Sequence, residues 1–342
     1  MLIAVPPETT LRHLTIDQFG GPEELRVVSR GPLPEPGRGE VLIAVEAASV
    51  QFTDTVIRRG LYHDAGPAPL TPGYDVVGRV HAVGEGVEPW TIGDRVADLT
   101  KTGGCATHIV RASEGLVRVP DSLDPAEATA LSLSGVTAYQ MLFRQARVRP
   151  GHRVLVQGGN GGVGWFALQL LAARGITTWT TARPAHHAAL RALGAHPVDY
   201  RDPTWPRRVR EASEGGVDFV FDGQGARGFR DSLHALRRKG RLVIIGSSAA
   251  VQASRTMTGS IVGAMLRNLN PFGPRVGMYS ITETRKRRPA AFREDLAELL
   301  AMLERGELNV RIDRRIGFDG VARAHADLEA GGVSGKIVLL PS

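Results

Sequence analysis

The sequence predicts an α/β protein with two domains, a mostly antiparallel β domain and a doubly wound parallel sheet covered by helices. Two observations lead to this prediction. Short strand-like runs separated by turn residues fill positions 11–118, whereas strand-like runs alternate with helical ones from position 150 to about 245. The 342 residues are enough for two domains of ordinary size, each with its own hydrophobic core.

Short strands bounded by turn residues characterise the N-terminal part. We expect them at residues 12–16, 25–28, 40–46, 75–83, 94–99 and 106–110, and together they indicate a compact, mostly antiparallel domain. The segment Asp124-Pro125-Ala-Glu127 then marks a change to helix. It places aspartate at the N-cap, proline at the first helical position and glutamate at the third, and the helical pattern continues to about Arg147.

A glycine-rich turn is the centre of the second domain. Residues 154–156 form a short apolar run, as expected for a central parallel strand covered on both faces. Glycines cluster at 158–164, and an apolar stripe at helical spacing then runs to Gly175. The first N–H groups of such a helix point beyond the strand end and favour a phosphate. The candidate contacts at this turn are Asn160, Gly161, Gly162 and Val163.

The glycine spacing differs from the GxGxxG fingerprint, and a tight strand-to-helix connection alone would also use glycines. The context favours dinucleotide binding, because strand, turn, helix and a second strand at 176–181 fit one βαβ unit. Further strands are expected at 197–200, 217–221 and 242–245, and further helices at 185–193, 204–213 and 226–238. This alternation predicts an open parallel sheet with helices on both faces.

The C-terminal tail carries a helix at 290–305, strand-like pieces at 309–316 and 336–340, and a helix at 319–330. We assign the tail to the first domain. Residues 1–128 and 283–342 would then form one domain, and residues 129–282 would form the dinucleotide-binding domain inserted into it. Ligands are expected in the cleft between the two domains.

The composition is that of a soluble globular protein, with 42% hydrophobic and 23% charged residues. No apolar run approaches the roughly 18 residues of a membrane span, and the N-terminus lacks the features of a signal peptide, so a cytoplasmic location is expected. The single cysteine excludes an intramolecular disulfide. The net charge of +7 comes without a nucleic-acid-binding motif, so neither nucleic acid nor a membrane is an expected partner.

The second strand of the βαβ unit indicates which dinucleotide is bound. A carboxylate about 20 residues past the glycine turn usually binds the ribose 2′-hydroxyl, but no Asp or Glu lies between Trp165 and Val198. The strand ends instead in Thr180-Thr181-Ala-Arg183. A guanidinium can make bidentate contact with a phosphate, so Arg183 and the Thr181 hydroxyl suit a 2′-phosphate and predict NADPH rather than NADH.

Several motifs occur in a specific order along the chain. They are Thr71-Pro-Gly-Tyr-Asp75, Gly93-Asp-Arg-Val96, Thr137-Ala-Tyr139, Gly161-Gly-Val-Gly164 and Gly335-Lys-Ile-Val-Leu339. In this order the chain resembles the medium-chain dehydrogenase/reductase superfamily, and within it the zinc-free quinone oxidoreductase branch with zeta-crystallin-like and VAT-1-like reductases. The resemblance covers nearly the whole chain and implies a GroES-like catalytic domain, a Rossmann domain and a homodimer.

The sequence departs from the zinc-dependent branch of that superfamily at the metal-binding positions. Where that branch has its first zinc cysteine this chain has Gln51, its Gly-His-Glu motif is Gly73-Tyr74-Asp75 here, and its later cysteine position falls near Leu133. The four-cysteine structural zinc lobe is absent from the sequence. Neither a catalytic nor a structural zinc is therefore expected.

The resemblance also assigns site residues by motif position. It places Gln51, Thr53 and Tyr62 beside the substrate, where the Gln51 amide and the Tyr62 hydroxyl can donate hydrogen bonds. The alternative for each is a structural polar side chain, and for Thr53 the two interpretations are equally supported. For the cofactor it adds Tyr200 at the adenosine end, Thr137 and the Gly246-Ser247 turn near the nicotinamide, and Lys336 near the cleft.

Neutral hydrogen-bond donors suit a conjugated acceptor. Hydride addition to an enone or quinone spreads negative charge into an enolate or hydroquinone anion, whereas a simple ketone gives a localised alkoxide. The leading hypothesis is therefore a zinc-independent, NADPH-dependent reductase of a quinone or an α,β-unsaturated carbonyl. Two alternatives remain. One is an enoyl-thioester reductase in a biosynthetic pathway, with an acyl carrier docked on basic patches, and the other is a non-enzymatic NADPH-binding or structural protein.

Overall fold

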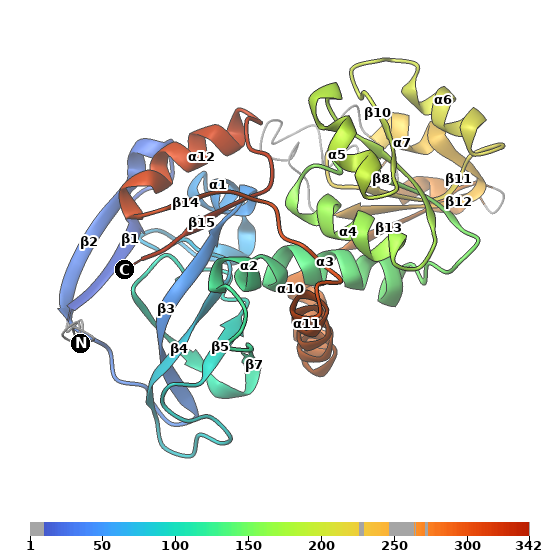
Figure 1. Cartoon of the computed structure of the whole chain (residues 1–342). Helices are drawn as coiled ribbons and strands as arrows, with labels where there is room; N and C mark the ends of the chain where they lie inside the picture. The colour runs from blue at the N-terminus through green and yellow to red at the C-terminus, as the bar shows by residue number, and fades with distance from the viewer. Residues whose placement is uncertain (1–9, 226–228, 246–262, 264, 271–272, 342) are drawn as a thin grey trace. The chain divides into compact units, whose positions relative to one another are not determined.

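The computed structural model describes residues 10–225, 229–245, 263, 265–270 and 273–341. The chain divides into two compact units, which we call unit 1 (residues 1–133 and 312–342) and unit 2 (residues 134–311). Figure 1 shows both units, with the chain coloured from its N-terminus to its C-terminus. No helix in the described part of the chain is both long and apolar enough to cross a membrane.

Unit 1 is built around a mostly antiparallel sheet. Its strand order is β14-β15-β3-β4-β5-β7, β6 pairs with β3, and β1 and β2 form a separate antiparallel ribbon. The strands are β1 (Thr10–Ile16), β2 (Leu25–Pro32), β3 (Glu40–Val50), β4 (Val76–Val83), β5 (Arg95–Asp98), β6 (His108–Ala112), β7 (Val117–Arg118), β14 (Ile312–Ile316) and β15 (Lys336–Leu339). The predicted antiparallel β domain is confirmed.

Helices α1 (Phe52–Arg58) and α12 (Val321–Glu329) belong to unit 1 and pack against each other. The core beside α12 joins residues from both ends of the chain. Val45 and Val50 of β3 lie in one hydrophobic cluster with Val321 of α12 and Ile337 of β15. Because β15 pairs antiparallel with β3, the C-terminal segment is an integral part of the sheet.

Unit 2 is a parallel sheet with the strand order β10-β9-β8-β11-β12-β13. Numbered along the chain this is the order 3-2-1-4-5-6 of the Rossmann fold, which confirms the predicted doubly wound sheet. The strands are β8 (Arg153–Gln157), β9 (Thr177–Thr181), β10 (His196–Val198), β11 (Val217–Asp222), β12 (Leu236–Ile245) and β13 (Arg275–Tyr279). The order reverses at β8, so the glycine turn after this strand lies where such folds bind ligands.

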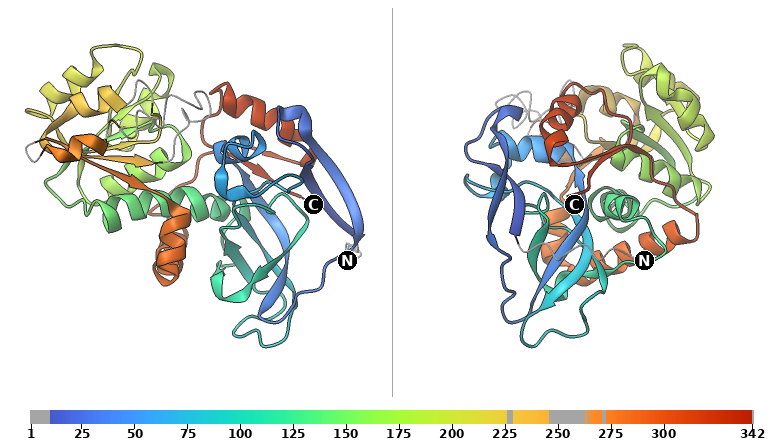
Figure 2. Two further views of the ribbon diagram at one scale, coloured as in Figure 1. Left: turned by 180° about the vertical axis from the view of Figure 1, so that it is seen from behind. Right: turned by 60° about the vertical axis from the view of Figure 1, so that its left-hand side comes forward.

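Helices lie on both sides of the parallel sheet, as the views in Figure 2 show. The helices of unit 2 are α3 (Val136–Tyr139), α4 (Gly162–Ala172), α5 (His187–Ala192), α6 (Trp205–Ala212), α7 (Arg230–Ala235), α10 (Ile281–Arg287) and α11 (Pro289–Glu304), of which α11 packs on α3 and α10. The helix predicted to start at Asp124 begins with α2 (Pro125–Ala130), where the Asp124 side chain accepts a hydrogen bond from the N–H of Ala126. It then continues through π-helical turns and α3 to Gln145.

Two features differ from the sequence-based expectation. The strand β13 and the short helix α10 were not predicted, because β13 alternates buried and exposed positions and has no continuous apolar run. The segment 283–311, which we expected in the first domain, belongs to unit 2. Its helix α11 is held to the helical segment after α3 by Asp295, which accepts hydrogen bonds from Gln140 (2.7 Å) and Arg144 (2.7 Å).

Candidate functional site

The glycine turn between β8 and α4 owes its shape to two glycines in particular. Gly158 has φ +73°, a conformation that residues with a Cβ seldom adopt. A Cβ on Gly164 would lie 2.3 Å from the Gly158 carbonyl oxygen, so only glycine lets α4 start this close to the turn. Residues 160–163 are partly exposed at the N-terminus of α4, where backbone N–H groups have no helical acceptor. This arrangement suits a phosphate.

A hydrogen-bond network fixes the strand ends around this turn. The N–H of Gly158 donates to the Thr181 hydroxyl (3.0 Å), and that hydroxyl donates to the side chain of Gln157 (3.1 Å). Gln157 in turn donates to Ser232 (2.6 Å), whose hydroxyl donates to Asp222 (2.7 Å). Three neighbouring strands, β9, β8 and β11, are thereby held at their carboxyl ends. Thr181 is buried and already hydrogen-bonded, so its hydroxyl supports the turn.

Arg183 and Tyr200 come together at the end of β9. The Arg183 Nε donates to the Tyr200 hydroxyl at 3.0 Å, and both side chains are exposed. They lie 17 residues apart in the sequence, and their contact follows from the parallel pairing of β9 with β10. Nearby Arg201 is different, because it is paired with Asp199 at 2.8 Å. The Arg183–Tyr200 pair offers a guanidinium and a phenol side by side to a ligand.

In unit 1 the residues predicted to lie near the substrate surround a buried polar cluster. Asp54 accepts hydrogen bonds from the N–H groups of Gln51 (2.8 Å) and Gly73 (3.1 Å), and it thereby fixes the backbone of both segments. The Gln51 side-chain amide donates to Asp75 Oδ2 (2.5 Å), and Asp75 also accepts from the N–H of Ser49 (3.0 Å). One N–H of the Gln51 amide is thus directed at a protein carboxylate.

The electrostatics of this cluster are set by burial. Burial, followed by the charge of Asp75, raises the pKa of Asp54 to about 7, although the two backbone N–H donors and Lys336 act in the opposite direction. Burial raises the pKa of Asp75 and lowers that of Lys336, while the mutual attraction of these two groups opposes both shifts. Lys336, the first residue of β15, therefore belongs to the same cluster as the two carboxyl groups.

Tyr62 forms a pair with Tyr74, a residue that the sequence reasoning did not select. Their hydroxyl oxygens lie 2.6 Å apart, and the rings meet edge to face. Tyr74 is 1% exposed, whereas Tyr62 is partly exposed. The signal available in the sequence was the position of Tyr74 in Gly73-Tyr74-Asp75, where the zinc-dependent branch carries histidine.

The remaining predicted residues are distributed over both units. Thr53 is the second residue of α1 and is partly buried, next to Asp54. Thr137 is buried in α3 of unit 2. Gly246 and Ser247 lie outside the described residues. No group of three or more His, Cys, Asp or Glu side chains that could hold a metal ion occurs within the described part of the chain.

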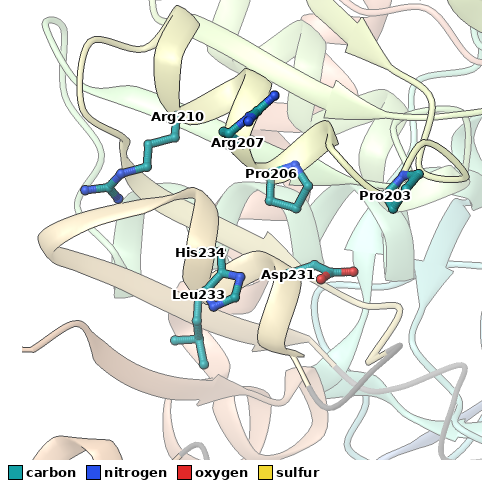
Figure 3. A pocket seen from close by; sticks show the side chains of 7 residues that line it. All are labelled: Pro203, Pro206, Arg207, Arg210, Asp231, Leu233 and His234. Atoms are coloured by element: carbon teal, nitrogen blue, oxygen red, sulfur yellow. The ribbon is translucent and has the colours of Figure 1, made fainter.

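A groove of about 480 Å³ lies between α6 and α7 of unit 2. Figure 3 shows its lining, which consists of Pro203, Pro206, Arg207, Arg210, Asp231, Leu233 and His234. The groove contains none of the residues of the glycine turn or of the Arg183–Tyr200 pair. Its basic charge is already partly compensated, because Arg207 pairs with Glu211 (3.5 Å) and Arg210 donates to the Leu236 carbonyl. We therefore do not place the nucleotide there.

Comparison with known proteins identifies the class to which this fold and site belong. Two family models match, the alcohol dehydrogenase GroES-like domain at residues 37–150 and the zinc-binding dehydrogenase family at residues 193–339. A quinone oxidoreductase of Pseudomonas aeruginosa is 34% identical over 96% of this chain and 99% of its own length. A synaptic vesicle membrane protein VAT-1 homolog of Rattus norvegicus is 32% identical over 97% and 84% of the two chains.

Solved structures give the same picture. A quinone oxidoreductase of Pseudomonas syringae has a TM-score of 0.86 at 29% identity and covers 97% of this chain and 100% of its own. The mycobacterial protein Rv1454c, solved in complex with NADPH, has a TM-score of 0.84 at 32% identity, with coverage of 96% and 100%. The CurK enoyl reductase has a TM-score of 0.82 at 25% identity, with coverage of 97% and 99%.

The fold and these matches define an oxidoreductase enzyme with a small-molecule substrate. The chain belongs to the medium-chain dehydrogenase/reductase superfamily, in its zinc-free quinone oxidoreductase branch. The description of the second family model mentions zinc, but the three metal-binding positions of the zinc-dependent branch correspond here to Gln51, Tyr74 and Leu133.

Proposed function

We propose that this chain is an NADPH-dependent, zinc-independent reductase that transfers hydride to a quinone or an α,β-unsaturated carbonyl compound. The choice of NADPH depends on the exposed Arg183–Tyr200 pair at the end of β9. The sequence between Trp165 and Val198 contains no aspartate or glutamate. An aspartate or glutamate there would favour a ribose 2′-hydroxyl, whereas a guanidinium favours a 2′-phosphate. A relative solved with NADPH supports this choice.

The glycine turn fits the pyrophosphate of such a cofactor. Gly161 and Gly162 at the start of α4 carry no Cβ, so a phosphate can approach the backbone N–H groups of Gly162 and Val163 closely. The N–H of Gly161 donates to the Gly158 carbonyl (3.0 Å) and holds the turn. The network through Thr181 and Gln157 holds the turn in this shape before any ligand binds. When bound, NADPH would supply the hydride, that is, one proton with two electrons.

The residues of unit 1 would act on the substrate oxygen. Hydride addition to the β-carbon of an enone moves the π electrons onto the carbonyl oxygen, which then needs a hydrogen-bond donor and finally a proton. The partly exposed Tyr62 hydroxyl is the donor that we assign to this oxygen. Asp75 holds the Gln51 amide in a fixed orientation, so its second N–H can donate in the same way. A quinone would be reduced by the same steps, with the proton received on oxygen.

Substitution of Arg183 tests the cofactor. Arg183→Gln should raise the Kd for NADPH by about tenfold to a hundredfold, because a charge-assisted hydrogen bond contributes about 1.5–3 kcal/mol. The Kd for NADH should stay within about twofold. Arg201→Gln is the matched control, since Arg201 is an exposed neighbouring arginine already paired with Asp199. Fluorescence titration measures all four constants, and equal loss in both arginine variants would contradict the assignment.

A substrate panel tests the reaction. Oxidation of NADPH, followed by its absorbance, should proceed with quinones and enones and should be at least about tenfold slower with saturated ketones of the same size. Tight NADPH binding without turnover on any member of the panel would refute the proposed reaction.

An enoyl-thioester reductase is the second candidate, because the CurK enoyl reductase is a structural neighbour. The basic groove between α6 and α7 is then the surface at which an acidic acyl carrier would dock (Figure 3). Activity on free enoyl thioesters together with inactivity on quinones would favour this candidate. Saturation at lower concentration with carrier-bound substrate would further separate a carrier-dependent enzyme from one that uses free thioesters.

A further inference from the structure

The Tyr62–Tyr74 pair raises the question of which hydroxyl donates to the other. The oxygens are 2.6 Å apart, the ring centroids are 5.9 Å apart, and the ring planes are nearly perpendicular at 87°. Among the described residues neither hydroxyl has a second hydrogen-bond partner. Two phenols carry two protons, and the single hydrogen bond between them uses one, so one O–H of the pair has no acceptor in the part of the chain that the structure describes.

Burial decides which O–H this is. If Tyr62 donated, the unpaired O–H would belong to Tyr74, which is 1% exposed, and an unsatisfied donor in the interior is costly. If Tyr74 donates, the unpaired O–H belongs to Tyr62, the more exposed of the two residues, so the cost of leaving it without a protein acceptor is smaller. The second arrangement is therefore more stable.

The backbone on both sides of Tyr74 is anchored. The N–H of Gly73 donates to Asp54 (3.1 Å), and the side chain of Asp75 accepts from the Gln51 amide and from the N–H of Ser49. The ring of Tyr74 therefore starts from a fixed backbone within the polar cluster. Burial, together with Tyr62 and the charge of Asp54, raises the pKa of Tyr74, so its hydroxyl keeps its proton and remains a donor.

We propose that Tyr74 is a positioning residue that donates a hydrogen bond to the Tyr62 oxygen and so directs the Tyr62 proton toward a bound substrate. A donor to the Tyr62 oxygen also polarises the Tyr62 O–H bond, because successive hydrogen bonds strengthen one another. The role rests on the proposed reductase function, in which Tyr62 donates to the substrate oxygen. In this role Tyr74 affects catalysis only through its hydrogen bond to Tyr62.

The direction of the hydrogen bond can be tested without any substrate. Tyr62→Phe leaves the O–H of the buried Tyr74 without an acceptor, whereas Tyr74→Phe leaves only the O–H of the more exposed Tyr62. Tyr62→Phe should therefore lower the thermal melting midpoint by about 2–6 °C, Tyr74→Phe should lower it by less than about 2 °C, and adding Tyr74→Phe to Tyr62→Phe should restore the loss. A larger loss in Tyr74→Phe than in Tyr62→Phe would overturn the proposal.

Kinetics test the catalytic consequence. With an enone at saturating NADPH, each single variant should lower kcat by about tenfold, and the double variant should be no slower than Tyr62→Phe. When NADPH is varied at a fixed, saturating enone concentration, the KM for NADPH should stay unchanged. Tyr139→Phe, which removes a tyrosine hydroxyl in unit 2, is the control and should match the wild type. Losses that multiply in the double variant would show that Tyr74 acts independently of Tyr62 and would refute the positioning role. An inactive wild type counts against the reductase function, whereas the melting comparison still decides the direction of the hydrogen bond.

Discussion

Single buried residues control how unit 1 responds to acid. His325 of α12 is 1% exposed and lies close enough to the buried Arg58 of α1 to interact electrostatically with it. Arg58 forms an ion pair with Glu329 at 2.5 Å. Burial, followed by the charge of Arg58, lowers the pKa of His325 from 6.5 to about 3. The folded protein therefore holds this imidazole neutral, whereas the unfolded chain protonates it below about pH 6.5.

Replacement of His325 should remove part of the acid sensitivity. The unfolded state binds the extra proton between about pH 6.5 and pH 3, so the wild type loses stability as the pH falls through this window. At pH 4 the loss from this residue is about 3 kcal/mol, because each pKa unit corresponds to about 1.4 kcal/mol. The free energy of unfolding of His325→Leu, measured by urea titration at pH 7 and pH 4, should fall less than that of the wild type. Equal pH dependence would contradict the buried neutral state.

The residues that could be predicted from the sequence are those linked by a short-range pattern. Arg183 follows directly from the end of the second strand, and Asp54 stands beside Gln51 at the start of a helix. Tyr74 and Asp75 were not selected, and Lys336 was placed near the cleft only by the family resemblance, because the contacts of these residues join segments that are far apart in the chain. The residue pattern of one sequence segment does not reveal which side chains from distant segments contact it in the folded protein.

At the scale of elements, glycines in the turn between β8 and α4 have two different roles. Gly161 leaves room for the proposed ligand, and Gly164 allows α4 to pack closely against the turn. Gly161→Ala places a Cβ 3.4 Å from the Gly158 carbonyl at a backbone φ of −82°, which the fold tolerates. Gly161 is the partly exposed N-cap residue of α4, beside the backbone N–H groups that we propose to bind the pyrophosphate. Gly164→Ala places a Cβ 2.3 Å from the same oxygen, so α4 or the turn must shift.

The two alanine variants should therefore fail in different ways. Gly164→Ala should lower the melting midpoint by about 3–10 °C, in line with the 1–3 kcal/mol typical of overpacking. Gly161→Ala should melt within about 2 °C of the wild type and raise the Kd for NADPH by about tenfold or more. Calorimetry and fluorescence titration separate the two effects. Unchanged NADPH affinity in Gly161→Ala would argue against a phosphate at this turn.

Helices and strands could be predicted from the sequence where nearly all of their residues are buried. β8 and α4 are buried over most of their length, so their apolar patterns were complete. The edge strand β13 has only Val276 and Tyr279 buried, and its pattern resembles that of a loop. The sequence also did not indicate that residues 283–311 belong to unit 2. The packing of α11 depends on contacts with a segment about 150 residues earlier, which no local pattern reveals.

At the scale of the molecule, we propose that the chain forms a homodimer through the edge of the parallel sheet. β13 is the outermost of the described strands in the strand order. Part of its outer edge is covered, because the Asn268 side chain pairs with the N–H and C=O of Val276 and Gln145 donates to the Met278 carbonyl. Large apolar side chains are exposed on and near it, namely Met265, Leu266, Leu269 and Met278, and Leu269 is 80% exposed. These exposed apolar side chains favour association with a second copy.

Charge on this edge should break the dimer. Leu269→Glu combined with Met278→Glu should halve the molar mass measured by light scattering, because two carboxylates per chain would be placed at the proposed contact. Ile92→Glu is a matched control, since Ile92 is 68% exposed in unit 1 and lies outside the parallel sheet. A wild type that runs as a monomer would rule out the dimer, and loss of the dimer in the control would show that the effect is not specific.

The pairing of β15 with β3 also sets an order of events during synthesis. A chain leaves the ribosome N-terminus first, so residues 134–311 are complete before β15 exists. Unit 2 therefore has all of its residues while the sheet of unit 1 still lacks β14 and β15. Because Lys336 lies on β15, the buried carboxyl groups of Asp54 and Asp75 meet this lysine only near the end of translation. The nascent protein should thus acquire its nucleotide-binding fold first and the polar cluster of unit 1 last.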